Sequence, residues 1–136
     1  MEKPIISPPQ ANSESPFLKL LNIHCSEVGE GKSEINFLLK DEHKNSWGVA
    51  HGGIILTLLD VAMAVAAKSS DRSGRSPLTL GLHANFLGVI TSEEIKVIAE
   101  TIKLTTTMAF TEAKLYSNNL LCASGTANFK FFKQKN

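Results

Sequence analysis

One long apolar segment constrains the fold of this chain more than any other feature of its sequence. Residues 53–67 are apolar nearly throughout, and only Thr57 and Asp60 interrupt them. A helix that is apolar on every side belongs inside a domain, so we expect Gly53–Ala67 to form a buried helix rather than a surface one. At about 1.5 Å per residue this helix would span roughly 22 Å, enough to cross a small domain.

Around this helix the sequence predicts mostly strands. Ser15 followed by Pro16 is a helix-start signal, and the short helix that it opens should end near Asn22. Six further runs read as strands: Ile23–Val28, Lys32–Leu39, Leu78–Leu87, Glu94–Lys103, Thr107–Ser117 and Leu120–Phe132. The order of these elements indicates an α+β fold with one antiparallel sheet of about six strands.

Local sequence signals also predict where the chain turns between strands and which side chains share a face of a strand. Gly29-Glu30-Gly31 and Asn118-Asn119 are expected to form tight turns between strands, because Gly and Asn tolerate positive φ. Alternation predicts that two sets of apolar side chains each share one face of their strand. The first set is Leu78, Leu80, Leu82, Ala84 and Phe86, and the second is Ile95, Val97 and Ala99.

Length and composition exclude several classes of protein. The 136 residues are 43% hydrophobic, which suits a single domain, expected over residues 15–133 after a disordered tail at 1–14. The 14 basic and 13 acidic residues nearly cancel, so we expect no nucleic-acid partner. No signal peptide is recognisable, and the apolar run Ile54–Ala67 is shorter than the roughly 20 residues of a membrane helix, so no membrane partner is expected.

The cysteines and histidines indicate neither a metal site nor covalent catalysis. Cys25 and Cys122 show neither metal-ligand nor redox spacing, and no disulfide set accompanies them, which favours the reducing cytoplasm. The four histidines do not cluster as metal ligands do, and no Gly-x-Ser-x-Gly nucleophile motif occurs. We therefore expect no metal, no cofactor, and no serine or cysteine nucleophile.

Asp60 is the most informative residue, because a carboxylate within an apolar helix is costly unless it is hydrogen-bonded, reaches water or faces a site. Helical spacing places Asp60 on one face with Gly53, Thr57 and Ala64, looking back toward the helix start, where free N–H groups favour negative charge. Two readings follow. Asp60 either serves chemistry together with the turn before the helix, or is a structural aspartate bonded to a neighbouring strand or subunit.

The segment that precedes Asp60 carries a resemblance. Residues 45–53 read Asn-Ser-Trp-Gly-Val-Ala-His-Gly-Gly, and the acid follows nine residues after His51. The combined pattern resembles hotdog-fold acyl-CoA thioesterases of the phenylacetate-degradation type, over about residues 16–132. Further matching stretches are Thr79 with Leu82, Asn85-Phe86-Leu87, Met108–Ala113 and Ala123–Ala127.

The resemblance implies a curved antiparallel sheet wrapped around the long helix, and self-association into a dimer or tetramer with active sites at the dimer interface. In such enzymes the thioester carbonyl accepts a hydrogen bond from a helix-start amide, here Gly52, helped by the side chain of Asn45. His51 would position this turn or the substrate. Asp60 of the partner subunit would activate water or attack the carbonyl directly.

Other contacts to an acyl-CoA substrate are implied less directly. Gly53 and Thr57 would lie beside the substrate, and Thr79 stands where relatives place a hydroxyl that holds water. The alternative for Thr79 is an ordinary threonine that faces outward from its strand. Basic residues that usually meet the CoA phosphates are missing after the third strand and in the fourth-to-fifth turn. Other cations could replace them or be simple surface charges, namely Arg72, Arg75 and Lys103.

Two alternatives to a thioesterase are weighed. One is a hotdog module that binds acyl-CoA without catalysis, but Asn45, His51, Gly52 and Asp60 are all present, and no DNA-binding extension accompanies the domain. The other is a hotdog hydratase or dehydratase, which would need a catalytic histidine in a different helix pattern. The sequence therefore favours thioester hydrolysis and leaves the acyl group and its carrier open.

Overall fold

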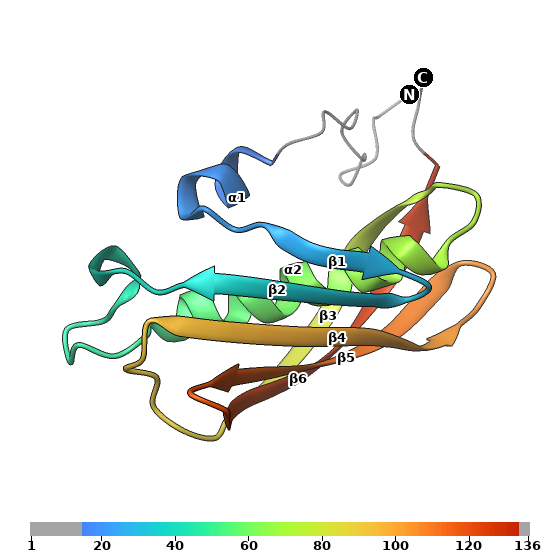
Figure 1. Cartoon of the computed structure of the whole chain (residues 1–136). Helices are drawn as coiled ribbons and strands as arrows, with labels where there is room; N and C mark the ends of the chain where they lie inside the picture. Colours follow the sequence, from blue (N-terminus) through green and yellow to red (C-terminus); the bar gives the residue numbers. More distant parts are fainter. Residues whose placement is uncertain (1–14, 134–136) are drawn as a thin grey trace.

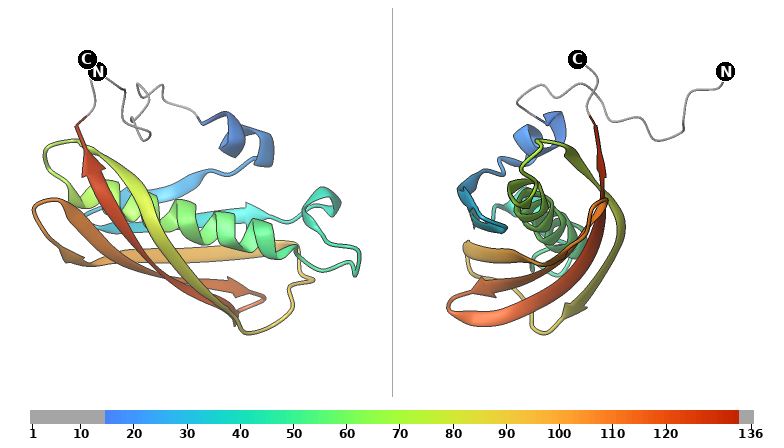
Figure 2. Two further views of the ribbon diagram at one scale, coloured as in Figure 1. Left: turned by 180° about the vertical axis from the view of Figure 1, so that it is seen from behind. Right: turned by 90° about the vertical axis from the view of Figure 1, so that its right-hand side faces the viewer.

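One antiparallel sheet curves around a single long helix in the computed structural model (Figure 1). The structure describes residues 15–133, with the side chains of residues 26–28 left out, so the tail predicted at 1–14 lies outside the described residues. Seen end on, the sheet forms a trough with the helix lying inside it (Figure 2). The expected α+β fold with a six-stranded curved sheet is confirmed.

The elements follow the expected order closely. Along the chain they are α1 (Pro16–Leu21), β1 (Cys25–Gly29), β2 (Lys32–Leu38), the 3-10 helix η1 (Asp41–His43), α2 (Gly52–Ser70), β3 (Ser76–Phe86), β4 (Glu94–Leu104), β5 (Met108–Ser117) and β6 (Leu120–Phe132). The strand order in the sheet is β1-β2-β4-β5-β6-β3. Because α2 carries the chain from β2 across to the far side of the sheet, β3 becomes an edge strand beside β6.

Helix and turn signals in the sequence are confirmed in detail. The Ser15 hydroxyl accepts the Leu18 N–H and caps α1, which begins at Pro16. Asn118 and Asn119 have φ of 55° and 62°, so the β5–β6 hairpin turns through two left-handed residues as expected. The β1–β2 turn uses a left-handed pair in the same way, with φ of 49° at Glu30 and 80° at Gly31.

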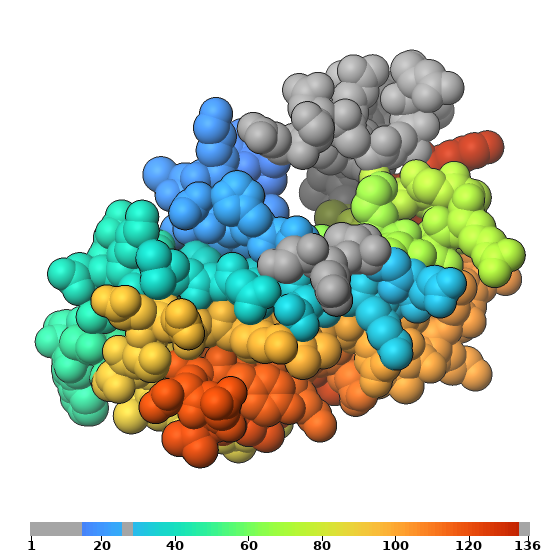
Figure 3. Space-filling view, in the orientation of Figure 1, coloured from blue at the N-terminus to red at the C-terminus, as the bar shows by residue number. Residues whose placement is uncertain are grey.

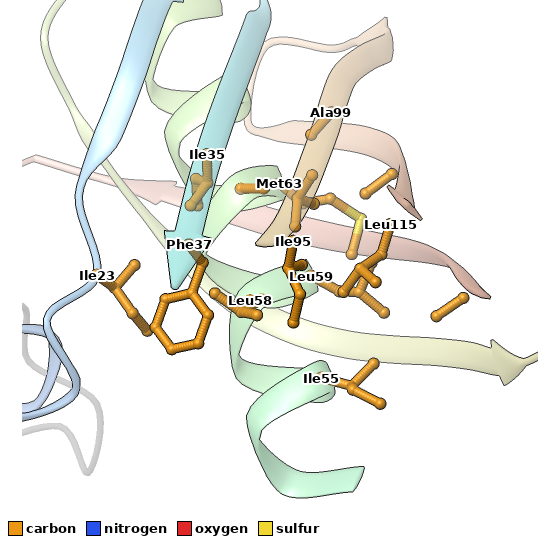
Figure 4. Packing of buried hydrophobic residues seen from close by; sticks show 14 of the residues in the cluster. Ile23, Ile35, Phe37, Ile55, Leu58, Leu59, Met63, Ile95, Ala99 and Leu115 are labelled. Atoms are coloured by element: carbon orange, nitrogen blue, oxygen red, sulfur yellow. The ribbon is translucent and has the colours of Figure 1, made fainter. Parts of the chain in front are cut away.

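The core lies between α2 and the concave face of the sheet. Leu58, Leu59 and Met63 point from the helix toward apolar side chains of β2, β4 and β5 (Figure 4). Eight helix residues are buried: Ile54, Ile55, Leu58, Leu59, Ala62, Met63, Ala66 and Ala67. The expected inward set on β4, which is Ile95, Val97 and Ala99, is also buried. Close packing of this kind supplies most of the stability of the domain.

The helix is covered on only one side, which differs from the expectation of a helix buried all round. Leu56 remains 37% exposed, and Asp60, Val61 and Ala64 are half-buried. The six strands cannot enclose the helix completely, because β1 and β3 are the two open edges of the sheet. A partly apolar stripe of α2 that contains Asp60 therefore stays accessible in a single chain.

The length of α2 exceeds what the apolar run alone indicated. The helix has 19 residues and a mean hydropathy of 1.6, so its length and composition alone would suit a membrane-crossing segment. The core helix of a water-soluble protein can meet the same criteria, and here the sheet packs along α2 on its buried side. The absence of a membrane partner stays a prediction.

A glycine of β6 lets the helix approach the sheet. A side chain at Gly125 would meet Leu59 Cδ1 and Met63 Cε at 3.4 Å and the His83 carbonyl oxygen at 3.3 Å. The contact with the His83 carbonyl oxygen is tighter than ordinary van der Waals packing and involves rigid backbone, and the two side-chain contacts lie at the lower limit of ordinary packing. Residue 125 therefore has to be small where α2 lies across the sheet.

A β-bulge in β3 overturns part of the face prediction. Thr79 pairs with Phe129 and Gly81 with Asn128, so Leu80 is an extra residue and the register shifts at this point. Thr79 shares the helix-facing side with buried Phe129, whereas Leu78, paired with exposed Lys130, faces outward. The predicted common face is therefore wrong for Leu78 and Leu80, because the bulge reverses the alternation in mid-strand. It is confirmed for Leu82, Ala84 and Phe86, whose partners on β6 are all buried.

Candidate active site

The start of α2 is built around a histidine cap. His51 has extended backbone angles, and its Nδ1 accepts the Gly53 N–H at 2.8 Å. The His51 carbonyl accepts the N–H groups of Ile54 and Ile55. Among the described residues, no acceptor takes the Gly52 N–H. This one amide at the positive end of the helix is therefore left free for an external oxygen.

Asn45 stabilises the loop that leads into the start of α2. Its Oδ1 accepts the Trp47 N–H at 2.9 Å and the Val49 N–H at 3.3 Å. The loop is tied to the rest of the molecule because the Ala50 N–H donates to the Ile90 carbonyl. The side-chain oxygen of Asn45 is thus committed to the loop, and only its NH₂ group is left to meet a ligand.

Asp60 lies on the accessible stripe of α2 and has one side-chain partner. The Thr79 hydroxyl donates to Asp60 Oδ1 at 2.8 Å, from the inward side of the β3 bulge. Partial burial raises the pKa of Asp60 above its ordinary value of 3.8, and the Thr79 hydrogen bond offsets part of that rise. The carboxylate is therefore only partly compensated for its burial, which costs the folded state stability.

Thr57 and Gly53, both predicted to bind substrate, are hydrogen-bonded to each other. The Thr57 hydroxyl donates to the Gly53 carbonyl at 2.8 Å, one helical turn back. Its oxygen can still accept a hydrogen bond, but its proton is already used. Gly53 in turn needs to be small, since a Cβ there would lie 3.0 Å from His51 Nδ1.

The helix brings some of the sequence-predicted residues together and keeps others apart. His51, Gly53 and Thr57 are linked by hydrogen bonds at the helix start, and Asp60 is linked to Thr79. Asp60 follows Gly52 by two turns, which is about 12 Å along the helix axis. A carbonyl that accepts the Gly52 N–H therefore lies too far from Asp60 of the same chain for direct contact.

Sequence reasoning missed a residue at this turn. A Cβ on Gly52 would lie 3.8 Å from the Phe86 ring, so this ring, which is 53% exposed, stands beside Gly52. Phe86 comes from the end of edge strand β3, a segment distant in sequence from the loop. No local pattern signals this proximity, because it depends on β3 lying next to β6.

The three cations considered for CoA phosphates differ in how they are bound. Arg75 donates from Nε and Nη2 to the Asp71 carboxylate at 3.2 and 3.0 Å, and its guanidinium lies over the Phe131 ring. This pairing lowers the pKa of Asp71 to about 2. Arg75 is thus already occupied, whereas Lys103 and Arg72 are exposed. Among the described residues, no group of three His, Cys, Asp or Glu side chains could hold a metal ion.

A curved antiparallel sheet around one long helix, with a capped glycine turn at the helix start and an acid two turns later, defines a hotdog-fold protein of the thioesterase class. The sequence profile described as the thioesterase superfamily matches residues 48–123, which include His51, Gly52, Asp60 and Thr79. The chain belongs to the thioesterase superfamily.

Individual relatives agree with this assignment. The chain is 32% identical over 117 residues to PA0474 of Pseudomonas aeruginosa, a candidate esterase, covering 85% of this chain and 87% of that protein. The solved structure of PA5202, a conserved protein of the same organism, aligns with a TM-score of 0.84 and 25% identity over 88% of this chain and 95% of that one. A mutant of the phenylacetic acid degradation protein PaaI from Thermus thermophilus shares the fold, with a TM-score of 0.79 and 20% identity over 88% of this chain and 100% of that one. The resemblance identified from the sequence is confirmed.

Proposed function

We propose that this protein hydrolyses acyl-CoA thioesters at sites formed by two subunits. Membership of the thioesterase superfamily supports thioester hydrolysis in general. The observation that carries the specific proposal is Asp60, a carboxylate with a raised pKa on an otherwise apolar and partly uncovered helix. The free Gly52 N–H supplies the second group that the reaction needs.

The chemistry divides between these two groups. The thioester carbonyl oxygen accepts the Gly52 N–H, which stabilises the negative charge that develops there by roughly 3–4 kcal/mol in well-studied acyl-transfer sites. Ionised Asp60 either takes a proton from water as the water attacks the carbonyl carbon, or attacks the carbon itself. In the first route the C–S bond breaks, the free acid is released, and the proton held by Asp60 passes to the departing thiolate. In the second route the C–S bond breaks as the acyl group is transferred to Asp60 in a mixed anhydride, the thiolate takes a proton from solvent, and water then hydrolyses the anhydride to release the acid and restore the Asp60 carboxylate. Thr79 holds the carboxylate in place from the bulge of β3.

The distance between Gly52 and Asp60 within one chain means that a working site needs two subunits. Gly52 and Asp60 of one chain lie about 12 Å apart along the helix axis, whereas the groups acting on one carbonyl must both lie within about 3 Å of the reacting atoms. Edge strand β3 has a free side and carries Thr79 and Phe86, so pairing of two β3 strands would bring the two helices near each other. We propose a dimer of this kind in the cytoplasm, which can pair further into a tetramer.

A matched pair of variants tests the role of the helix-start amide. Gly52→Pro removes the N–H, yet Pro is favoured at the first position of a helix and His51 already has the extended conformation that precedes proline. Gly52→Ala keeps the N–H and adds only an ordinary contact with Phe86. Acyl-CoA hydrolysis, followed through the released thiol, should fall about 100- to 1,000-fold in Gly52→Pro and stay near wild type in Gly52→Ala.

The result also tests the proposal as a whole. If a panel of aliphatic and aromatic acyl-CoA thioesters gives no hydrolysis with the wild-type dimer, the proposed function is wrong. If short pantetheine thioesters are cleaved as fast as acyl-CoA, the carrier is not CoA. Sedimentation that shows a fully active monomer would contradict the two-subunit site.

A further inference from the structure

A cavity of about 370 Å³ opens beside the catalytic turn, between α1, η1 and the first two turns of α2. Its apolar wall includes Phe17, Leu21 and Ile54, and its rim includes His51 and Thr57. In the space-filling view, the residues of α1 (blue) and those that follow β2 (teal) gather at this end of the molecule (Figure 3). The volume falls within the range of about 300–1,000 Å³ that is usual for small-molecule pockets.

His43 is the buried polar side chain in the lining of this cavity, which is also lined by Glu42, Lys44, His51 and Thr57. His43 lines the cavity although its side chain is only 6% exposed. Its Nδ1 accepts the Lys40 N–H at 2.9 Å, so Nδ1 carries no proton and the ring hydrogen must lie on Nε2. The ring packs against Phe37 with centroids 4.8 Å apart, which fixes its orientation. His43 thus has a defined tautomer in a defined position.

The Nε2 group of His43 has no hydrogen-bond partner among the described residues, yet it is accessible to solvent. Every described side-chain nitrogen or oxygen that is fully buried has a hydrogen-bond partner, so the unpartnered Nε2 must keep accessible surface. The cavity is the open space that His43 borders. An N–H donor held in a mostly apolar pocket selects a ligand atom that accepts a hydrogen bond.

We infer that this cavity receives the acyl group of the substrate, and that His43 selects acyl groups with a ketone or hydroxyl oxygen some bonds beyond the thioester carbonyl. This inference rests on the proposed function, because it takes the thioester carbonyl to lie at Gly52. The His43 carbonyl accepts the His51 N–H at 2.9 Å, so the donor and the catalytic turn belong to one connected loop. His43 is a specificity-determining residue that does not touch the reacting carbon.

Two variants separate the two nitrogens of the ring. His43→Asn places an amide oxygen near Nδ1, where it can still accept the Lys40 N–H, but leaves no donor at the position of Nε2. His43→Gln places an amide nitrogen near Nε2 and gives up the acceptor for Lys40. The first variant should lose selectivity and keep the loop, and the second should keep part of the selectivity and lose thermal stability.

The measured quantity is the ratio of kcat/KM for an oxygenated thioester to that for its plain counterpart. Hexanoyl-CoA is compared with 4-oxohexanoyl-CoA and 5-oxohexanoyl-CoA, which differ from it by one oxygen atom. For the better oxo isomer we expect a wild-type ratio of about ten, the value for one net hydrogen bond, and a ratio near one in His43→Asn. Because both rates come from one enzyme sample, partial unfolding of a variant cancels from its ratio.

Binding of inert analogues distinguishes this inference from the proposed function. S-hexyl-CoA and S-(5-oxohexyl)-CoA contain no thioester and can be titrated by calorimetry whether or not the protein hydrolyses acyl-CoA. Tighter binding of the oxo compound by about tenfold, lost in His43→Asn, supports the cavity assignment even if no hydrolysis is found. Equal binding of the two compounds together with a wild-type ratio below two overturns it, as does a ratio that His43→Asn leaves unchanged.

Discussion

Replacing Asp60 by asparagine separates the chemistry of this residue from its place in the fold. The asparagine side chain has nearly the same shape, and its Oδ1 can still accept the Thr79 hydroxyl, which lies at 2.8 Å in the wild type. The change removes only the charge. If Asp60 is the base or nucleophile, kcat should fall by a factor of about 10²–10⁴, or roughly 2.7–5.4 kcal/mol of transition-state stabilisation.

Stability should move in the opposite direction from activity. Burial raises the pKa of Asp60, so the folded state is penalised once the group ionises, at pH values above both the ordinary 3.8 and the raised pKa. Asp60→Asn removes that penalty, and its melting temperature at pH 7 should equal or exceed that of the wild type. The advantage should disappear as the pH falls below about 3.8, where the wild-type carboxyl is protonated in both states.

The assay pairs thiol release with a melting curve on the same sample. Asp41→Asn is the matched control, because the Asp41 side chain is 99% exposed and should be replaceable without loss of activity. A folded Asp60→Asn dimer with undiminished turnover would refute the catalytic assignment. A variant that loses activity only by unfolding would show instead that Asp60 is structural.

Three further changes follow from contacts in the structure. Thr79→Val removes a hydrogen bond that lowers the pKa of Asp60, so the acid limb of the kcat/KM profile should move to higher pH, and an unmoved limb would count against the assignment. Arg75→Leu should destabilise the fold at pH 7, and chemical denaturation should show the deficit shrinking as the pH falls from about 4 toward 2, because Asp71 has a pKa of about 2. Gly125→Val should cost about 1–3 kcal/mol in urea unfolding, and a neutral result would contradict the tight approach of α2.

Much of the fold was predictable because its signals are local. The Ser15 cap, the Asn118-Asn119 turn and the alternation in β4 each depend on a few neighbouring residues, and each is confirmed. The ends of β6 agree residue for residue with the prediction, Leu120–Phe132. The last turn of α2 was missed because Lys68, Ser69 and Ser70 are polar, so the apolar pattern ends before the helix does.

The bulge at Leu80 could not be foreseen, and it decides the candidate site. Simple alternation would place Thr79 on the face opposite to Leu78 and Leu80, and therefore away from the helix. The extra residue at the bulge instead lets the Thr79 side chain face the helix and reach Asp60. Gly81 is a local signal compatible with a bulge, but the exact position of the extra residue depends on pairing with β6, which is distant in the sequence. The place of Phe86 beside Gly52 was unpredictable for the same reason.

The roles of the residues in the loop before α2 could be predicted only in part from the sequence. The pattern of Asn45, His51 and Gly52 marks a special turn, but not how its hydrogen bonds are divided. The structure shows Asn45 holding the loop and His51 capping the helix, which leaves the Gly52 amide free among the described residues. Catalysis by these residues, and its dependence on a second subunit, stay predictions.

Mixing two inactive variants tests the two-subunit site most directly. In a dimer of Asp60→Asn with Gly52→Pro, one site keeps the intact Gly52 of one subunit and the intact Asp60 of the other. The second site has lost both groups. Random mixing makes half of the dimers mixed, each with one working site of two, so activity should recover to about a quarter of the wild-type value. A mixture that exchanges subunits, as native mass spectrometry would show, and yet stays inactive would contradict the account.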